Sequence, residues 1–396
     1  MSNLAREIAT KFKEVFKTEP IIVRSPGRIN LIGEHTDYND GFVMPAAIDK
    51  EVIFAIAPSA NEKSIVHSAM YNEQFEFDLQ NPQKVKEPKW ANFLLGVLYK
   101  LKQEGYAIKP FSCVFGGEVP MGAGLSSSAA IECGFGYALS EVNNLNVPRL
   151  DIVRIGQWSE HNFVGVMCGI MDQYASVMGK ENHVIVLDCR SLTHRYSPID
   201  LKEYTLILCD TKVKHSLVDS EYNTRRSECE TGVSVLKKHH PQIQSLRDVS
   251  RDMLEAHRDE LKGKVYDRCL YVVQEIERVQ QASLDLEKGD LTSFGQKMFE
   301  THEGLSELYE VSCKELDFLV NEAKKFKEVL GARMMGGGFG GCTINIVRKD
   351  FVTEFENNLK VNYKKAFNID MPTYKVNIKD GTSIINKVQI LSHESV

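Results

Sequence analysis

A glycine- and serine-rich segment at 120–130 has the composition of a phosphate-binding loop. It contains two glycines that let the backbone approach a ligand closely and three serines that begin a predicted helix: Gly122, Gly124, Ser126, Ser127 and Ser128. Free N–H groups and the positive end of the helix dipole would face an anion there, and the hydroxyl groups could bind phosphate oxygens or Mg²⁺. A single serine would indicate only a helix cap, but three serines after two glycines favour phosphate binding.

A second polar cluster lies in the segment RINLIGEHTDYND at 28–40. Four ionisable side chains fall within ten residues, directly after a predicted strand and among glycines: Arg28, Glu34, His35 and Asp37. Exposed loops often have this composition. Convergent carboxylates nevertheless suit a polyhydroxylated ligand such as a sugar, because each carboxylate can accept hydrogen bonds from two hydroxyl groups. No H-E-x-x-H motif or His/Cys cluster indicates a transition metal.

Two further acidic residues complete the candidate site. Asp172 stands between apolar residues in GIMDQY, near the start of a predicted helix, where it could simply complement the helix dipole. Together with an anion loop and a polyol loop, however, Asp172 becomes the predicted base. Glu160, in the helical segment WSEH, is another acid that would ordinarily be a surface residue.

Two other motifs lack the context that their signatures require. The glycine cluster at 336–341 matches G-x-G-x-x-G, but a strand rather than a helix follows it, and Cys342 stands where a P-loop needs lysine. We expect a structural turn packed against the site. The tripeptide HRD at 257–259 is not followed by the asparagine of a protein-kinase catalytic loop, so we expect a solvated helix face.

The predicted secondary structure that positions these residues changes along the chain from mostly strands to mostly helices. A helix over 3–18 and strand patterns near 21–25 and 52–57 make the first 80 residues mostly sheet, whereas helices dominate between about 221 and 330. Further helices are predicted over 90–105, 129–144, 151–167, 264–283 and 350–367, and closing strands around 373–391. We place a soft domain boundary near 195–205.

Composition excludes several classes of protein. A chain of 396 residues is too long for one compact core, and its 43% hydrophobic and 26% charged content argues against disorder. The net charge of −6 provides no global positive field for nucleic acid or an anionic membrane surface, and no run of 18 apolar residues predicts a membrane span. Nine widely spaced cysteines without a C-x-x-C pair fit a reducing cytoplasm.

Three segments together resemble the GHMP small-molecule kinases. They are PGRINLIGEHTDYNDGFVMP at 26–45, VPMGAGLSSSAA at 119–130 and GGGFGGCT at 336–343, in the family's order and with GIMDQ in between. The first is similar to that of members that phosphorylate galactose. The resemblance spans essentially the whole chain and implies a two-domain α+β fold. A ribosomal-S5-like N-terminal domain over 1–200 and a ferredoxin-like C-terminal domain over 201–396 would hold sugar and nucleotide between them.

The resemblance also implies the reaction, which is transfer of the γ-phosphoryl group of MgATP to the C1 hydroxyl of galactose, the first step of galactose catabolism. Asp172 would face that hydroxyl, and Arg28 would lie beside it and the transferring phosphoryl group. Ser128 and Glu160 are the implied Mg²⁺ contacts. The implied substrate-binding residues are Glu34, His35, Asp37, Gly169 and Tyr222, and the implied nucleotide-binding residues are Trp90, Gly122, Gly124, Leu125, Ser126, Ser127 and Ser128.

Two alternatives lie within the same family: a kinase for N-acetylgalactosamine, and a non-catalytic sensor of galactose and ATP. The segment HTDYND at 35–40 looks like the galactose-specific form, which disfavours the amino-sugar kinase. Sensors have a shortened or altered serine loop, whereas SSSAA is intact here alongside Asp172 and Arg28. We expect a monomer whose partners are galactose and ATP, with no nucleic acid and no membrane.

Overall fold

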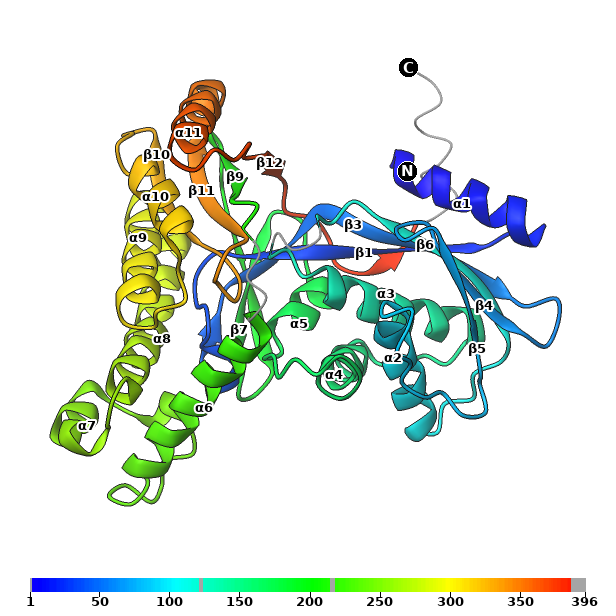
Figure 1. The fold of residues 1–396 in the computed structure, drawn as a ribbon, viewed down its shortest axis with the longest axis horizontal. Helices are drawn as coiled ribbons and strands as arrows, with labels where there is room; N and C mark the ends of the chain where they lie inside the picture. The colour runs from blue at the N-terminus through cyan, green and yellow to red at the C-terminus, as the bar shows by residue number, and fades with distance from the viewer. Residues whose placement is uncertain (1, 121–123, 214–217, 386–396) are drawn as a thin grey trace.

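The computed structural model describes residues 2–120, 124–213 and 218–385, and its largest sheet has six strands. They lie in the order β13-β1-β3-β6-β4-β5, with β4 parallel to β6 and the other pairs antiparallel. The bounds are β1 (Ile21–Asn30), β3 (Pro45–Pro58), β4 (Ser64–Ser68), β5 (Glu73–Phe77), β6 (Phe111–Gly117) and β13 (Ser383–Ile384). The last strand, β13, therefore returns from the far end of the chain to pair with β1 (Figure 1).

Helices cover both faces of this sheet, because β1 and β3 are apolar on both sides. Phe12 of α1 packs with Ile22 and Ile53 on one face. The neighbouring residues Val23 and Phe54 point to the other face, which α3 and α5 cover, with α2 and α4 packed outside them (Figure 1). These helices are α1 (Asn3–Phe16), α2 (Ala91–Gln103), α3 (Ser127–Asn143), α4 (Arg149–Ser159) and α5 (Met171–Met178).

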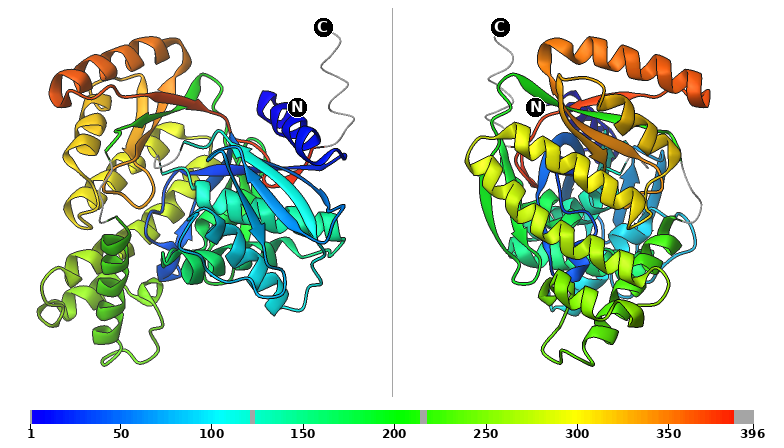
Figure 2. Two further views of the ribbon diagram at one scale, coloured as in Figure 1. Left: turned by 45° about the vertical axis from the view of Figure 1, so that its right-hand side comes forward. Right: turned by 90° about the vertical axis from the view of Figure 1, so that its left-hand side faces the viewer.

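The second half of the chain forms a four-stranded antiparallel sheet and most of the remaining helices. Its strands, in the order β10-β11-β9-β12, are β10 (Val329–Met334), β11 (Cys342–Arg348), β9 (Tyr204–Asp210) and β12 (Thr373–Val376). Its helices are α6 (Val218–Leu236), α7 (Arg251–Ala256), α8 (Val265–Glu287), α9 (Leu291–Glu307), α10 (Lys314–Ala323) and α11 (Val352–Phe367). Helices α9 and α10 pack on the sheet, α8 lies against α9, and α6 and α7 lie together at one end of the molecule (Figure 2).

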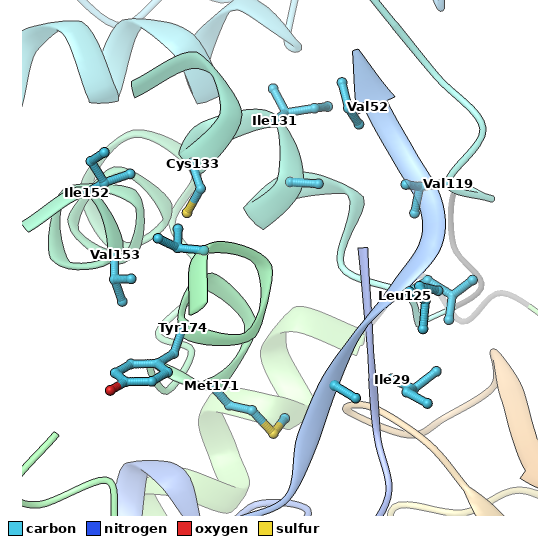
Figure 3. Packing of buried hydrophobic residues seen from close by; sticks show 14 of the residues in the cluster. Ile29, Val52, Val119, Leu125, Ile131, Cys133, Ile152, Val153, Met171 and Tyr174 are labelled. Atoms are coloured by element: carbon cyan, nitrogen blue, oxygen red, sulfur yellow. The ribbon is translucent and has the colours of Figure 1, made fainter. Parts of the chain in front are cut away.

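A small third sheet and a shared core join the two halves. The small sheet has the order β2-β7-β8, with β2 (Phe42–Val43), β7 (His183–Asp188) and β8 (Thr193–Pro198). The largest apolar cluster runs from the first sheet to residues of the second half such as Leu206, Val279 and Phe294. Figure 3 shows a part of this cluster that includes Leu125 of the serine loop, Ile29 of β1 and Met171 of α5. Loops from both halves are thereby held against one continuous core.

Most predicted elements are present, with different lengths. The helix expected over 3–18 ends at Phe16, and the strand patterns near 21–25 and 52–57 are parts of the longer β1 and β3. The helix expected over 151–167 is α4 followed by a π-helical turn at Glu160–Val164. The sheets change between β8 and β9, but β13 belongs to the first sheet, so the boundary at 200/201 stays a prediction. Within the described ranges, no helix is both long and apolar enough to cross a membrane.

Candidate active site

A cavity of about 590 Å³ lies between the two halves and brings nearly all the predicted site residues together. The predicted residues that line it are Arg28, Glu34, His35, Asp37, Gly124, Leu125, Ser126, Ser127, Ser128, Glu160, Gly169, Asp172 and Tyr222. Two predicted residues are not among them. Gly122 lies outside the described residues, and Trp90 is buried behind the wall.

An arginine and an aspartate form a bidentate ion pair at the centre of the cavity. Arg28, near the end of β1, donates from Nε to Asp172 Oδ1 (2.7 Å) and from Nη2 to Asp172 Oδ2 (2.9 Å). Asp172 lies in the first turn of α5 and keeps 27% of its side chain exposed. Burial alone would lower the pKa of Arg28, but Asp172 and Glu34 outweigh it, so that this pKa is raised. The pair therefore presents a carboxylate, fixed in orientation, to the cavity.

The serine loop places the N-terminus of α3 at the cavity. Ser126 precedes the helix in the left-handed conformation (φ 58°), and its side chain makes no capping hydrogen bond to the helix. Its hydroxyl donates instead to Asp172 Oδ2. The first N–H groups of α3 thus have no side-chain cap and can bind an anion. Gly27 must lack a side chain, because a Cβ there would lie 2.6 Å from the carbonyl oxygen of Leu125.

A buried arginine from the second half of the chain holds the predicted sugar loop. Arg333 of β10 is fully buried, and both of its terminal nitrogens lie 3.1 Å from Glu34 Oε1. It also donates to the carbonyl oxygens of Asn30, Leu31 and Met334. The same Glu34 oxygen accepts from the Gly336 amide (2.8 Å). Arg333 therefore ties the end of β1 to β10 and fixes the carboxylate of Glu34 in the cavity wall.

Asp37 is a buried carboxyl group that approaches the backbone closely. Its Oδ1 accepts from the Tyr38 amide (3.0 Å). A Cβ at Gly169 would lie 1.7 Å from Asp37 Oδ2, so only glycine fits beside it. Burial, followed by the nearby Asp172, raises the pKa of Asp37 to about 7. A ligand hydroxyl that donates to this carboxyl group would stabilise its charged form.

Aromatic rings surround His35 and orient it. Its Nδ1 lies 2.7 Å from the Tyr38 hydroxyl, which lies 2.7 Å from the Tyr309 hydroxyl, and this contacts Cys229 Sγ at 3.2 Å. The ring of Tyr222 lies 5.2 Å from the ring of His35. Burial lowers the pKa of His35 to about 3, against a smaller raising effect of the Gly337 backbone, so the imidazole is neutral. A neutral ring can offer its second nitrogen to a ligand as donor or acceptor.

Glu160 and Ser128 form a further polar part of the cavity wall, and Glu132 lies behind them. Glu160 and Ser128 both line the cavity, and the side chain of Glu160 is hydrogen-bonded to that of Glu132, one helical turn after Ser128. Glu132 is fully buried, and burial, followed by Glu160, raises its pKa well above the usual range. A neutral Glu132 can donate a hydrogen bond to the carboxyl group of Glu160, which lines the same cavity as Ser128.

The structure separates Trp90 from the cavity by one aromatic ring. Trp90 is 4% exposed, its Nε1 donates to Glu73 Oε2 (2.7 Å), and its ring stacks on that of Tyr71 with an interplanar angle of 4°. Tyr71 lines the cavity. A direct contact between Trp90 and a ligand in this cavity is therefore not supported, and the ring next to Trp90 that lines the cavity is that of Tyr71.

The glycine turn at 336–341 is packed against the site, as expected, and all six of its residues line the cavity. A Cβ at Gly337 would lie 3.2 Å from Tyr222 Cδ2, and the carbonyl oxygen of Met335 would lie 3.2 Å from a Cβ at Gly124. The turn thus spaces the serine loop from α6, and bulkier residues would push the two apart.

Several residues of the site were missed from sequence. Arg333 offered a signal, since it is one charge within the apolar strand VLGARMM, which is typical of a buried ion pair. Glu132 offered a weaker signal, as a glutamate among small and apolar residues of a buried helix. Tyr71, Tyr309 and Cys229 carry no local signal, because only the tertiary fold brings them to the cavity or to His35.

Sequence comparisons place this chain among sugar kinases. The galactokinase galactose-binding signature matches residues 10–58, the GHMP kinases N terminal domain matches residues 92–180, and the GHMP kinases C terminal domain matches residues 282–364. The chain is 42% identical over 363 residues to the galactokinase of Thermotoga petrophila, covering 92% of this chain and 99% of that protein. It is 39% identical to the galactokinase of Clostridium acetobutylicum, covering 95% and 98%.

Solved structures agree with these matches. The galactokinase of Lactococcus lactis, crystallised with galactose, superposes with a TM-score of 0.91 at 36% identity, covering 95% of this chain and 98% of that one. A mevalonate kinase of Methanococcus jannaschii has a TM-score of 0.63 at 17% identity, covering 92% and 100%, and shows the shared fold alone. The expected two-domain α+β GHMP kinase fold is thereby confirmed, and the chain belongs to the galactokinase family of the GHMP kinases.

Proposed function

We propose that this protein transfers the γ-phosphoryl group of MgATP to the C1 hydroxyl of galactose and releases galactose 1-phosphate and ADP. One observation carries the proposal. The Arg28–Asp172 pair lies in the same cavity as an uncapped helix N-terminus and a set of buried carboxyl groups. A phosphate donor and a polyhydroxylated acceptor would thus meet at one fixed carboxylate.

Asp172 orients the acceptor hydroxyl and takes its proton. Phosphoryl transfer passes through a loose transition state, so positioning and charge stabilisation supply most of the acceleration and a base contributes less. Asp172 suits this role because Arg28 and the Ser126 hydroxyl hold its carboxylate in one orientation. The guanidinium of Arg28 also offsets negative charge that collects on the transferring group.

The sugar would be recognised by side chains that neighbouring residues of the protein already hold in one orientation. Glu34 is held by Arg333, Asp37 is enclosed by Gly169, and His35 is hydrogen-bonded through Tyr38. A polar group held for one hydroxyl arrangement is left unpaired when an epimer binds, which costs about 1–3 kcal/mol for a neutral group and more for a charge. We assign the axial 4-hydroxyl to Asp37, with Glu34 toward the 6-hydroxyl and Tyr222 closing the sugar site.

The donor chemistry also fits Mg²⁺. A hydroxyl oxygen of Ser128 and a carboxylate of Glu160 line the same cavity as the N-terminus of α3, and Mg²⁺ prefers one or two such oxygens together with phosphate oxygens and water. When bound, Mg²⁺ would offset the negative charge of the ATP phosphates. Gly124, Leu125, Ser126 and Ser127 would surround those phosphates, and the aromatic wall near Tyr71 would lie toward the base.

We assign the protein to the cytoplasm as a monomer that begins galactose catabolism. All nine cysteines lie in the described part of the chain and are free, as expected in a reducing compartment. Residues of one chain are sufficient to line the cavity, which supports a working monomer.

Release of ADP tests the proposal most simply. Purified protein is given MgATP with galactose, N-acetylgalactosamine, glucose or mevalonate in parallel assays. We expect galactose to give the highest kcat/KM, with glucose lower by about tenfold to several hundredfold. A preference for N-acetylgalactosamine would assign the amino-sugar kinase, and sugar and ATP binding without ADP release would assign a sensor.

A further inference from the structure

Two histidines and a glutamate come together at the end of the molecule formed by α6 and α7. His239 follows the end of α6, His257 follows α7, and Glu260 lies in the 3₁₀ turn Arg258–Glu260. His239 Nε2 lies 2.9 Å from Glu260 Oε1, and His257 Nδ1 lies 3.2 Å from the same oxygen. None of the three lines the active-site cavity. The HRD segment at 257–259, which resembles a protein-kinase motif, therefore contributes His257 to this cluster.

The spacing of these atoms fits one metal ion. One ligand atom from each residue lies within 4.8 Å of the other two. Metal–ligand bonds of about 2.0–2.2 Å in tetrahedral geometry separate ligand atoms by roughly 3.3–3.5 Å. The observed contacts of 2.9 and 3.2 Å require only a small outward movement of the Glu260 carboxylate, whose side chain is 46% exposed.

The cluster is partly exposed to solvent, so that a metal ion could reach it. The side chains of His239 and His257 are 38% and 18% exposed, so solvent reaches the cluster. Their rings stack at 4.0 Å between centroids with an interplanar angle of 16°. Because the lone pair of an imidazole nitrogen lies in the ring plane, one ring must turn out of this stack when both nitrogens bind one ion, and water can complete the coordination from the open side.

We propose that His239, His257 and Glu260 form a binding site for one divalent transition-metal ion of the Zn²⁺, Co²⁺ or Ni²⁺ class. Two imidazole nitrogens and one carboxylate favour these ions over Mg²⁺, which prefers oxygen ligands. The site is separate from the proposed Mg²⁺ contacts Ser128 and Glu160. A bound ion would tie the end of α6 to α7 and the turn that follows it, and so stabilise this end of the protein against unfolding.

Titration with Co²⁺, followed by its visible absorption, tests the proposal on the full chain after chelator treatment. We expect saturation at one ion per chain, displacement by Zn²⁺ and no displacement by millimolar Mg²⁺. Loss of second-shell groups already costs about 10–100-fold in metal affinity, so His239→Ala and Glu260→Gln, which remove ligands, should each weaken binding at least about tenfold. His183→Ala is the matched control, because His183 lies on β7 outside the cluster and should leave binding unchanged.

Thermal unfolding provides an independent measurement. Zn²⁺ should raise the midpoint of the wild-type protein and not that of His239→Ala, and circular dichroism should show that both variants are folded. Absence of a saturable Co²⁺ spectrum in the wild type would overturn the proposal. Equal Co²⁺ affinity in the wild type and in folded His239→Ala would also overturn it, because the ion would then bind elsewhere.

Discussion

Replacing Arg333 should destabilise the protein far more than replacing an arginine on its surface. In Arg333→Ala, the buried Glu34 loses its charged partner, and the carbonyl oxygens of Asn30, Leu31 and Met334 lose a donor. Removing one partner of a buried ion pair costs about 3–5 kcal/mol, because the remaining charge is left uncompensated. Each orphaned buried carbonyl adds up to about 1–3 kcal/mol unless water reaches it.

Urea unfolding, followed by circular dichroism, measures this loss. The matched control is Arg251→Ala, which removes an ion pair with Glu277 whose side chains are 54% and 49% exposed, and should cost only about 0–1 kcal/mol. Adding Glu34→Gln to Arg333→Ala should recover part of the stability, because the unpaired charge disappears. Equal unfolding midpoints for Arg333→Ala and Arg251→Ala would refute the reasoning.

Three further substitutions probe the sugar loop. A carboxyl group whose pKa is raised on folding lowers the stability of the folded protein as pH rises from its unfolded to its folded pKa. The stability of the unliganded wild type relative to Asp37→Asn should therefore fall between about pH 4 and pH 7 in urea unfolding, and a difference that does not change with pH would argue against the raised pKa of Asp37. Gly169→Ala places a methyl group on Asp37 and should raise the KM for galactose with little effect on that for ATP; unchanged galactose kinetics would mean that the carboxyl group moves aside freely. Tyr309→Phe removes the hydroxyl that contacts Tyr38, whereas Tyr38 keeps its contact with His35 Nδ1, so the loss is that of one hydrogen bond, about 0.5–1.5 kcal/mol, and should raise the galactose KM several-fold; equal effects on both substrates would instead indicate a general loss of structure.

Local motifs predicted most of the residues that line the cavity. These residues lie in short segments, next to glycines or at the ends of strands and helices, where the local backbone fixes the direction of each side chain. Arg28 lies near the end of a strand that is longer than the predicted one, Ser126 to Ser128 lie at the start of a helix, and Asp172 lies in a first helical turn. The direct contact between Arg28 and Asp172 was not predicted from the residues themselves. It is formed across 144 positions, and a resemblance to a family was needed to place the two side by side.

The supporting residues were harder to predict for the same reason. Arg333 contacts Glu34 across 299 positions, and Tyr309 contacts Tyr38 across 271 positions. The residue type alone does not show whether an arginine is buried or on the surface. Only the burial of the strand that carries it distinguishes the two cases. No motif in the sequence indicated a transition metal, because the residues of the proposed metal site lie on different elements, with His239 and Glu260 21 positions apart.

The turnover number of Asp172→Asn, at saturating galactose and MgATP, tests the central claim most directly. Asparagine keeps the shape of the side chain and one acceptor for Arg28 but cannot take the proton of the C1 hydroxyl. General-base catalysis contributes about 10²–10⁴-fold, so we predict that kcat falls by that range while galactose still binds by calorimetry and circular dichroism is unchanged. A kcat close to that of the wild type, in a folded variant that binds both substrates, would contradict the assignment of Asp172 as the base.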